Sequence, residues 1–270
     1  STPPESSAAS DVYKRQEEYW DLHADLSMDG QNPVRFEVTK YEGSAFDPKT
    51  EQQAVEVVER LTGAEYSVSN LEARKTSSKP PAPFITSTLQ QAASTRLGFS
   101  VKKTMTLAQR LYEAGHITYM RTDSTNLSGE SVAACRAFID ANYRKAYLPE
   151  APIRYGAREG AQEAHEAIRP SNVELRSGSL KDAERDAQRL YELIWRQFVA
   201  CQMTPARYLS TTVTVSAAGY DMTARGRVVE FDGYTRVQTP AAKKGDDAIL
   251  PDYQLSDRLS LCLLYTSPSP

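Results

Sequence analysis

Residues 86–126 read TSTLQQAASTRLGFSVKKTMTLAQRLYEAGHITYMRTDSTN and decide the fold of the middle of the chain. Apolar residues recur at helical spacing twice in this stretch, each time after a hydroxyl residue that can cap a helix and before a glycine that can end one. The candidate caps are Thr86 or Ser87 and then Ser100, and the glycines are Gly98 and Gly115. The alternating segment that follows predicts a strand. Helix, tight turn, helix and strand is the order of a helix-turn-helix with a wing.

Two further helices are predicted on the carboxyl side of this unit. One begins at Ser128 and runs to Tyr143, with Val132, Cys135, Phe138 and Ile139 on its apolar face. The other is longer and continues to Pro205. Ser179 with Asp182 three residues on resembles a capping box, which places the beginning of that helix at Ser179.

The flanks of the helical block show the two-residue alternation of strands. VRFEVTKYEG (34–43) predicts a strand on the amino side, and residues 50–61 predict a capped helix. After Arg207, the segments YLSTTVTVSA, YDMTARGRVVEF and YTRVQ predict antiparallel strands, with turn signals at Ala218-Gly219, Arg225-Gly226 and Asp232-Gly233. The expected fold class is therefore α+β, with a helical, winged-helix-like domain inserted into a β-rich antiparallel domain.

A tyrosine, two arginines, an aspartate and a histidine fall in two short stretches, ITYMRTDSTN (117–126) and QEAHEAIRPS (162–171). An extended chain would place the Tyr119 phenol and the Arg121 guanidinium on the same face. A phenol has an unperturbed pKa of about 10, so attack on phosphorus needs a base or a cationic field, which Arg121 can supply. Taken alone, the same residues also fit a half-buried packing tyrosine beside a solvated arginine.

Charge is distributed unevenly along the chain, although the net charge is only −3. Residues 73–122 hold eight Lys or Arg and one acid, +7, whereas the remainder holds 24 basic and 34 acidic residues, −10. A basic segment that ends at Tyr119 predicts a surface for a nucleic-acid backbone. Its alternative is a solvated helical face. The candidate backbone contacts are Arg96, Lys102, Lys103 and Arg110.

Length and composition exclude several other classes of protein. A chain of 270 residues can bury a core and predicts two domains. No apolar run approaches the 18 or so residues that span a membrane, and we expect a cytoplasmic protein without a membrane partner. Cys135, Cys201 and Cys262 form no CxxC pair, so neither a disulfide framework nor a metal site is indicated.

Four stretches in order closely resemble bacterial type IA DNA topoisomerases. They are PPAPFITSTLQQAASTRLG (80–98), ITYMRTDSTN (117–126), EAHEAIRPS (163–171) and LYELIWRQFVACQMTPA (190–206). The resemblance implies that Tyr119 attacks one DNA strand and holds its 5′ end as a phosphotyrosine, and that Arg121 contacts the scissile phosphate. Asp123 and His165 match positions that arrange the cleavage site, and Thr122, Ser124 and Arg169 are further candidate DNA contacts. Without the resemblance, His165 is interpreted as a partly exposed helix residue, and Arg169 fits a phosphate contact or a structural salt-bridge partner equally well.

The resemblance also implies partners and a cofactor. Family members relax negative supercoils without ATP by passing a strand through an arch from which the helical domain swings away. Their Mg²⁺ is held by a TOPRIM domain, whose acidic cluster this sequence lacks, and a C-terminal zinc-ribbon region is not found here either. We therefore expect an internal fragment that does not relax DNA alone. Its expected partners are single-stranded or negatively supercoiled DNA, the TOPRIM domain and the C-terminal DNA-binding region, in the bacterial nucleoid.

Residues 1–16 and 262–270 resemble translated adapter sequence and are excluded from the expected fold. The β-rich arch domain is then expected at 17–78 and 207–261, and the helical domain with the tyrosine at 79–206. One alternative function remains open, a non-enzymatic winged-helix DNA-binding module, which would lose little if Tyr119 became Phe. A tyrosine recombinase is disfavoured, because that chemistry uses a different set of basic residues and the DNA 3′ end.

Overall fold

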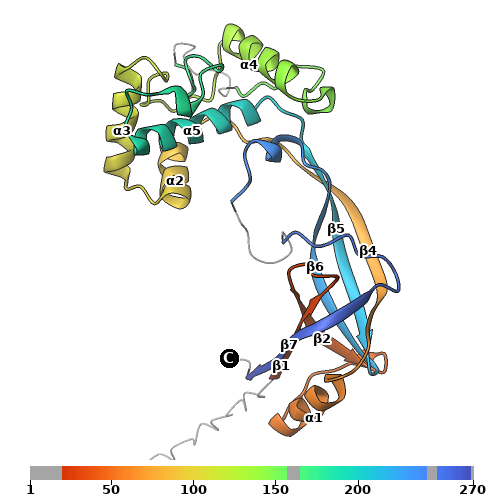
Figure 1. Cartoon of the computed structure of the whole chain (residues 1–270). Coiled ribbons are helices and arrows are strands. Elements are labelled where there is room, and N and C mark those ends of the chain that lie inside the picture. The colour runs from red at the N-terminus through yellow and green to blue at the C-terminus, as the bar shows by residue number, and fades with distance from the viewer. Residues whose placement is uncertain (1–19, 157–164, 242–247, 269–270) are drawn as a thin grey trace, which may run out of the picture. The chain divides into compact units, whose positions relative to one another are not determined.

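The computed structural model describes residues 20–156, 165–241 and 248–268, and these ranges contain five α-helices and seven β-strands (Figure 1). The chain is a mixed α/β protein with a large antiparallel sheet. It divides into two compact units, the first drawn from residues 1–73, 211–226 and 250–270 and the second from residues 74–210 and 227–249. Among the described helices, none is both long and apolar enough to cross a membrane.

The sheet contains all seven strands in the order β1-β7-β4-β5-β6-β2-β3, and β1 also pairs with β2. Pairing therefore follows a closed circuit of six strands, to which the two-residue β3 is added. The strands are β1 (Trp20–Ser27), β2 (Val34–Tyr41), β3 (Ser44–Ala45), β4 (Tyr66–Ser78), β5 (Ala206–Ala217), β6 (Tyr220–Phe231) and β7 (Arg258–Pro268). The strands β4, β5 and β6 each have residues in both units, so continuous strands connect the units.

Alternating apolar residues explain the inner face of the first unit. Leu22, Ala24 and Leu26 of β1 are buried, and Phe36 and Val38 of β2 are buried with them. The helix α1 (Glu51–Leu61) begins where the Thr50 hydroxyl accepts a hydrogen bond from the Gln53 amide, as its sequence predicts. Its buried residues are Ala54, Val57 and Leu61.

The β5–β6 hairpin turns at Ala218 and Gly219, which have φ values of 50° and 84°. Positive φ at both positions is the type I′ geometry that the sequence signal indicates. The turn signal at Arg225-Gly226 is wrong, because Gly226 is a buried residue inside β6 and lacks a positive φ. The segment YTRVQ is also wrong as a strand: Gly233–Arg236 forms the 3-10 helix η3.

The carboxyl end of the chain belongs to the sheet. Residues 262–270 were excluded from the expected fold, yet Cys262–Pro268 continue β7, and residues 263–268 pair with β1 from Trp20 to Asp25. The physical reason is backbone pairing with β1, since residues 262–268 have no alternating apolar pattern of their own. Cys262 is exposed, whereas Cys135 and Cys201 are buried and free of disulfides.

The second unit is built around α5 (Arg185–Ala200), whose buried face includes Leu190, Tyr191, Ile194, Trp195 and Phe198. Three helices pack against it (Figure 1), namely α2 (Thr86–Leu97), α3 (Val101–Glu113) and α4 (Gly129–Asn142). The remaining short helices are η1 (Lys145–Tyr147) and η2 (Ser177–Ser179). Ser100 and Ser128 cap α3 and α4 through their hydroxyls, as predicted.

Two predicted helix beginnings are wrong. The N-cap of α2 is Ile85 rather than Thr86 or Ser87, and the Thr88 hydroxyl accepts the Ile85 amide hydrogen in place of a side-chain cap at that position. For α5, Ser179 and Asp182 form no capping box. Helix α5 begins six residues after Ser179, because Leu180 is buried and its carbonyl accepts a hydrogen bond from Gln188 Nε2.

The predicted wing does not form. Ile117 makes an isolated antiparallel bridge with Pro170, and Tyr119 belongs to no strand. The ladder does not extend, because the His116 amide donates to the Leu111 carbonyl and the Arg169 amide to the Thr118 hydroxyl. The neighbouring backbone groups bond elsewhere, with the Thr122 amide donating to the Thr86 hydroxyl at 2.9 Å. The helix-turn-helix of α2 and α3 is therefore present without its strand.

Candidate active site

Three segments that are far apart in the sequence meet around Tyr119, and all three lie in the second unit. The segment at 116–126 is held on one side by the segment at 167–171. The Thr118 amide donates to the Arg169 carbonyl at 3.0 Å, and the Ser171 amide donates to the His116 carbonyl at 2.9 Å. The Thr118 hydroxyl also donates to the Ala167 carbonyl at 2.7 Å. The stretch ITYMRTDSTN and the stretch EAHEAIRPS are thus hydrogen-bonded to each other.

Thr86 holds the same segment on its other side. Its hydroxyl donates to the Met120 carbonyl at 2.7 Å and accepts from the Thr122 amide at 2.9 Å. Its own amide donates to the Thr122 carbonyl at 3.0 Å. Met120 is 1% exposed, so the backbone on the carboxyl side of Tyr119 is fixed by both burial and hydrogen bonds.

Tyr119 itself projects from this fixed backbone and is 47% exposed. Its ring packs edge-on against Tyr112 of α3, with ring centroids 5.1 Å apart and an interplanar angle of 62°. Tyr112 is 41% exposed and so reaches the same solvent-accessible surface. An accessible phenol on an immobilised backbone is the arrangement that a nucleophile needs, because the reacting atom is free while its position is set.

Arg121, Asp123 and His165 are exposed. Within the described ranges, none of these three side chains makes a hydrogen bond or an ion pair with another residue. Arg121 and Asp123 belong to the Tyr119 segment, and His165 comes two residues before Ala167, whose carbonyl accepts from the Thr118 hydroxyl. No such contact connects the three side chains to one another within the described ranges. The first three residues of QEAHEAIRPS, at 162–164, lie outside the described residues. The roles of Arg121, Asp123 and His165 stay predictions.

Arg169 forms an ion pair with Glu166, with Nη2 and Oε2 2.9 Å apart. The other oxygen of Glu166 accepts from the Ser128 amide at 2.9 Å, at the beginning of α4. Arg169 Nη1 donates to the Pro170 carbonyl, while its Nε is buried and has no partner in the described part of the chain. These contacts favour the salt-bridge interpretation of Arg169, and its contact with DNA stays a prediction.

Thr122 and Ser124 shape the loop that follows Tyr119. The Thr122 hydroxyl accepts from the Ser124 amide, and the Ser124 hydroxyl accepts from the Asn126 amide, each at 3.1 Å. Side-chain-to-backbone bonds of this kind hold a loop in place of regular secondary structure. Both residues are partly buried, and each hydroxyl uses one acceptor position for a hydrogen bond within the loop.

Of the four cations of α2 and α3 that were predicted to contact a DNA backbone, some form ion pairs with acids and some do not. Lys103 Nζ lies 2.6 Å from Asp186 Oδ2, and Arg110 forms an ion pair with Glu184. The hydrogen bond from Lys103, together with one from Arg189, lowers the pKa of Asp186. In the described ranges, Lys102 and Arg96 have no carboxylate partner. Two of the four predicted backbone contacts are therefore already paired with acids at α5.

A Mg²⁺ site does not fit the described part of this chain. Among the described residues, no three His, Cys, Asp or Glu side chains lie close enough together to hold a metal ion.

Comparison with known proteins places this site in a family. The family model for DNA topoisomerase matches residues 11–266, so the chain belongs to the DNA topoisomerase family. DNA topoisomerase 1 of Pseudomonas aeruginosa is 58% identical over 248 residues, which cover 92% of this chain and 29% of that protein. The protein of the same name from Escherichia coli K12 is 56% identical over 246 residues, 91% of this chain and 28% of that protein.

A solved structure has the same fold. Full-length topoisomerase I from Thermotoga maritima matches with a TM-score of 0.66 and 29% sequence identity, over 94% of this chain and 41% of that one. The chain spans 29% of the length of the Pseudomonas aeruginosa protein and 28% of that of the Escherichia coli protein.

Proposed function

We propose that this chain is the part of a type IA DNA topoisomerase that carries the nucleophile, and that Tyr119 is that nucleophile. The observation that carries the proposal is the exposed Tyr119 phenol on a backbone fixed from both sides by Thr86 and by residues 167–171. Family membership supports it, because topoisomerases must break and rejoin a DNA strand.

The chemistry exchanges one phosphodiester for another. The Tyr119 oxygen forms a bond to the phosphorus, and the bond from phosphorus to the 3′ oxygen of the preceding nucleotide breaks. The phenolic proton leaves with the attack, and the departing 3′ oxygen takes up a proton. Because the new bond is of the same type as the old one, religation needs no ATP, and the 3′ hydroxyl reverses the step.

Arg121 is proposed to stabilise the charge that develops on the phosphate oxygens. A guanidinium can bond two of these oxygens at once and stays charged throughout the reaction. The absence of an ion-pair partner in the described ranges leaves Arg121 available for this contact. Asp123 and His165 are proposed to orient the same phosphate. Strand passage, relaxation and the use of Mg²⁺ are proposed for the longer protein.

A hybrid enzyme tests this proposal. The matching 246 residues of the E. coli protein would be replaced by this chain, and the hybrid incubated with end-labelled single-stranded DNA. We expect a denaturant-resistant adduct on the strand whose 5′ end is new. Tyr119→Phe should remove the adduct and preserve DNA binding, whereas Tyr143→Phe, a matched change at a partly buried tyrosine, should preserve both. A folded hybrid with no adduct, or an adduct that survives Tyr119→Phe, would contradict the proposal.

A further inference from the structure

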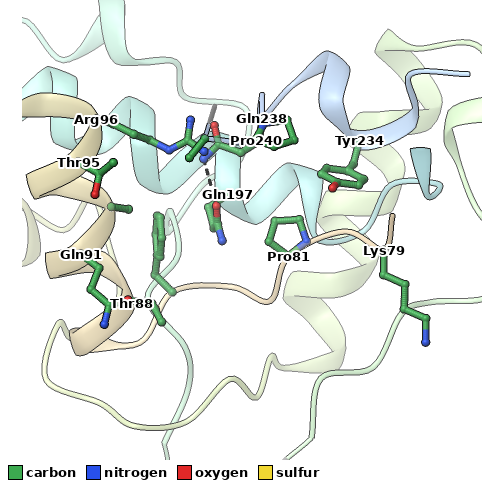
Figure 2. Close-up of a pocket in the computed structure, with 13 residues that line it drawn as sticks. Lys79, Pro81, Thr88, Gln91, Thr95, Arg96, Gln197, Tyr234, Gln238 and Pro240 are labelled. Carbon is green, nitrogen blue, oxygen red and sulfur yellow. Dashed lines mark hydrogen bonds between the residues drawn. The ribbon is translucent and has the colours of Figure 1, made fainter. Parts of the chain in front are cut away.

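A groove on the second unit lies between α2, the end of α5 and residues 234–241, and its lining includes neither Tyr112 nor Tyr119. Figure 2 shows Gln91, Thr95 and Arg96 of α2 on one wall and Gln197, Gln238 and Pro240 on the other, with the Arg96 side chain extending towards Gln238 and Pro240. Its volume is about 300 Å³. This size is at the lower end of the range for ligand sites. We call it the α2 groove.

The described lining of the α2 groove contains two cations and no acid. Lys79 lies at one end and Arg96 on the α2 wall (Figure 2). Within the described ranges neither cation has an ion-pair partner, in contrast to Lys103 and Arg110 of α3, which have carboxylates from residues 184 and 186. Two of the unpaired cations of the basic segment, Lys79 and Arg96, thus line one concave surface. A concave cationic site attracts anionic groups.

The far wall of the groove is rigid and polar. Gln238 Nε2 donates to Gln197 Oε1 at 3.0 Å, and Gln197 Nε2 donates to the Ala82 carbonyl at 2.9 Å. Tyr234 is fixed by a 2.7 Å hydrogen bond with Ser78. On the α2 wall, the exposed Gln91 and Thr95 have no hydrogen-bond partner in the described part of the chain. They offer donors and acceptors that a ligand can use.

Helix α2 connects this groove to the nucleophile segment. It begins at Thr86, which bonds the backbone at Met120 and Thr122, and its groove-lining residues run from Thr88 to Arg96. Ten residues of helix separate Thr86 from Arg96, about 15 Å along the axis at 1.5 Å per residue. Phosphates spaced at about 3.4 Å or more along one strand would cover this distance in a few nucleotides.

We propose that the α2 groove binds a segment of single-stranded DNA beside the strand segment that Tyr119 cleaves. Arg96 and Lys79 each contact a phosphate, while Gln91 and Thr95 bond sugar or base atoms. A single strand fits because it is flexible enough to enter a groove of this volume, whereas a duplex is a stiff rod. The inference deepens the proposed function, on which it rests, by assigning a second subsite for the same substrate.

Salt-dependent binding of the full 270-residue chain tests the proposal. The affinity for a fluorescein-labelled oligonucleotide would be measured by anisotropy between 50 and about 200 mM salt, the range over which phosphate contacts are readily resolved. Arg96→Gln and Lys79→Gln should each lower the affinity about tenfold, since a charged hydrogen bond is lost. Each should also reduce the log–log salt slope by about 0.7, and the double variant by about 1.4.

The matched control is Lys181→Gln. Lys181 is exposed, lies outside the groove and has no ion-pair partner among the described residues, so this variant removes the same charge. Far-ultraviolet circular dichroism would establish that all variants fold. The proposal is overturned if the groove variants keep the affinity and salt slope of Lys181→Gln, or if they weaken the binding of a duplex of equal length as strongly as that of the single strand.

The hybrid enzyme separates this proposal from the proposed function. With Arg96→Gln or Lys79→Gln, the DNA concentration that gives half-maximal adduct should rise about tenfold, while the maximal adduct rate stays unchanged. Loss of the maximal rate at saturating DNA would overturn the groove as a binding subsite and leave Tyr119 as the nucleophile. An adduct that does not depend on Tyr119 would instead overturn the proposed function, and the salt slope of the groove variants would still decide the inference.

Discussion

Thr86 fixes the backbone beside the proposed nucleophile through a single hydroxyl. Thr86→Val keeps the shape of the side chain but removes the donor to Met120 and the acceptor for Thr122. Losing both should lower the free energy of unfolding by about 1–3 kcal/mol and slow adduct formation in the hybrid. Urea unfolding and the adduct rate are the measurements.

Two further variants make that result specific. Thr86→Ser retains the hydroxyl and should behave like the unchanged chain. Thr106→Val removes a hydroxyl that bonds only the Lys102 carbonyl within α3, and it should change neither the stability nor the rate appreciably. If Thr86→Val matched Thr106→Val in both measurements, Thr86 would not position the segment.

Tyr112 restricts the orientation of the Tyr119 ring through an edge-on contact. Such ring pairs contribute about 0.5–1.5 kcal/mol. Tyr112→Leu should therefore slow adduct formation about two- to tenfold at saturating DNA, because fewer Tyr119 side chains face the phosphate. Tyr112→Phe retains the ring and should keep the rate. An equal loss in both variants would indicate that the Tyr112 hydroxyl matters and the ring contact does not.

At the scale of elements, helices were easier to predict than strands and turns. Caps at Thr50, Ser100 and Ser128 were predictable because a hydroxyl and an apolar repeat are local signals. The missing wing was not predictable in this way, since it depends on hydrogen bonds with Arg169 and Thr86, which are distant in sequence from Tyr119. The same applies to β1 and β7, which form through mutual pairing over a separation of more than two hundred residues.

In the candidate site too, local sequence signals were predictable and contacts between distant residues were not. Tyr119 and Arg121 could be proposed from the sequence, because their motif is contiguous. It gave no sign that Lys103 and Arg110 pair with acids of α5, nor that Lys79 and Arg96 line one groove, since those relations arise only when α2, α3 and α5 pack together. The role of Thr86 was missed for a related reason, as its hydroxyl was assigned to a helix cap.

The turn from β6 into η3 depends on a glycine. At Gly233, φ is +53°, and a Cβ would lie 2.4 Å from the Thr204 carbonyl oxygen and 2.5 Å from that of Pro205. These are backbone atoms, and the Thr204 carbonyl also accepts the Tyr234 amide hydrogen at 2.9 Å. Gly233→Ala should therefore lower the free energy of unfolding by about 3 kcal/mol or more, as measured in urea.

The control for this change is Gly98→Ala. Gly98 has a similar positive φ of +71°, but no atom lies within 4 Å of the added Cβ. Only the cost of the left-handed conformation remains, about 1–2 kcal/mol. Equal losses in the two variants would contradict the steric account of Gly233.

On the scale of the whole molecule, buried phenols make stability depend on alkaline pH. Burial raises the pKa of Tyr66, Tyr191 and Tyr253 to about 12, against about 10 in the unfolded chain. Their contribution to stability is fully present below pH 10 and is lost as the pH rises towards 12, because the unfolded chain releases these protons first. Urea unfolding should show the fall between pH 10 and 12.

Tyr66 and Tyr253 belong to the first unit and Tyr191 to the second, so both units should weaken over this range. Tyr66→Phe removes one titrating phenol, together with its hydrogen bond to the Leu61 carbonyl. The variant should be less stable at pH 8 yet lose less stability between pH 10 and 12. A pH dependence identical to that of the unchanged chain would contradict the assignment.

Identification of the tyrosine that becomes joined to DNA tests the central claim most directly. The chain has fifteen tyrosines, and Tyr112 lies against Tyr119, so loss of activity in a variant is weaker evidence than direct detection of the modified residue. The adduct formed by the hybrid would be digested with nuclease and protease, and the nucleotide-bearing peptide sequenced by mass spectrometry. We predict a nucleotide linked through its 5′ phosphate to Tyr119. A nucleotide on Tyr112 or any other tyrosine, or one linked through a 3′ phosphate, would contradict the account.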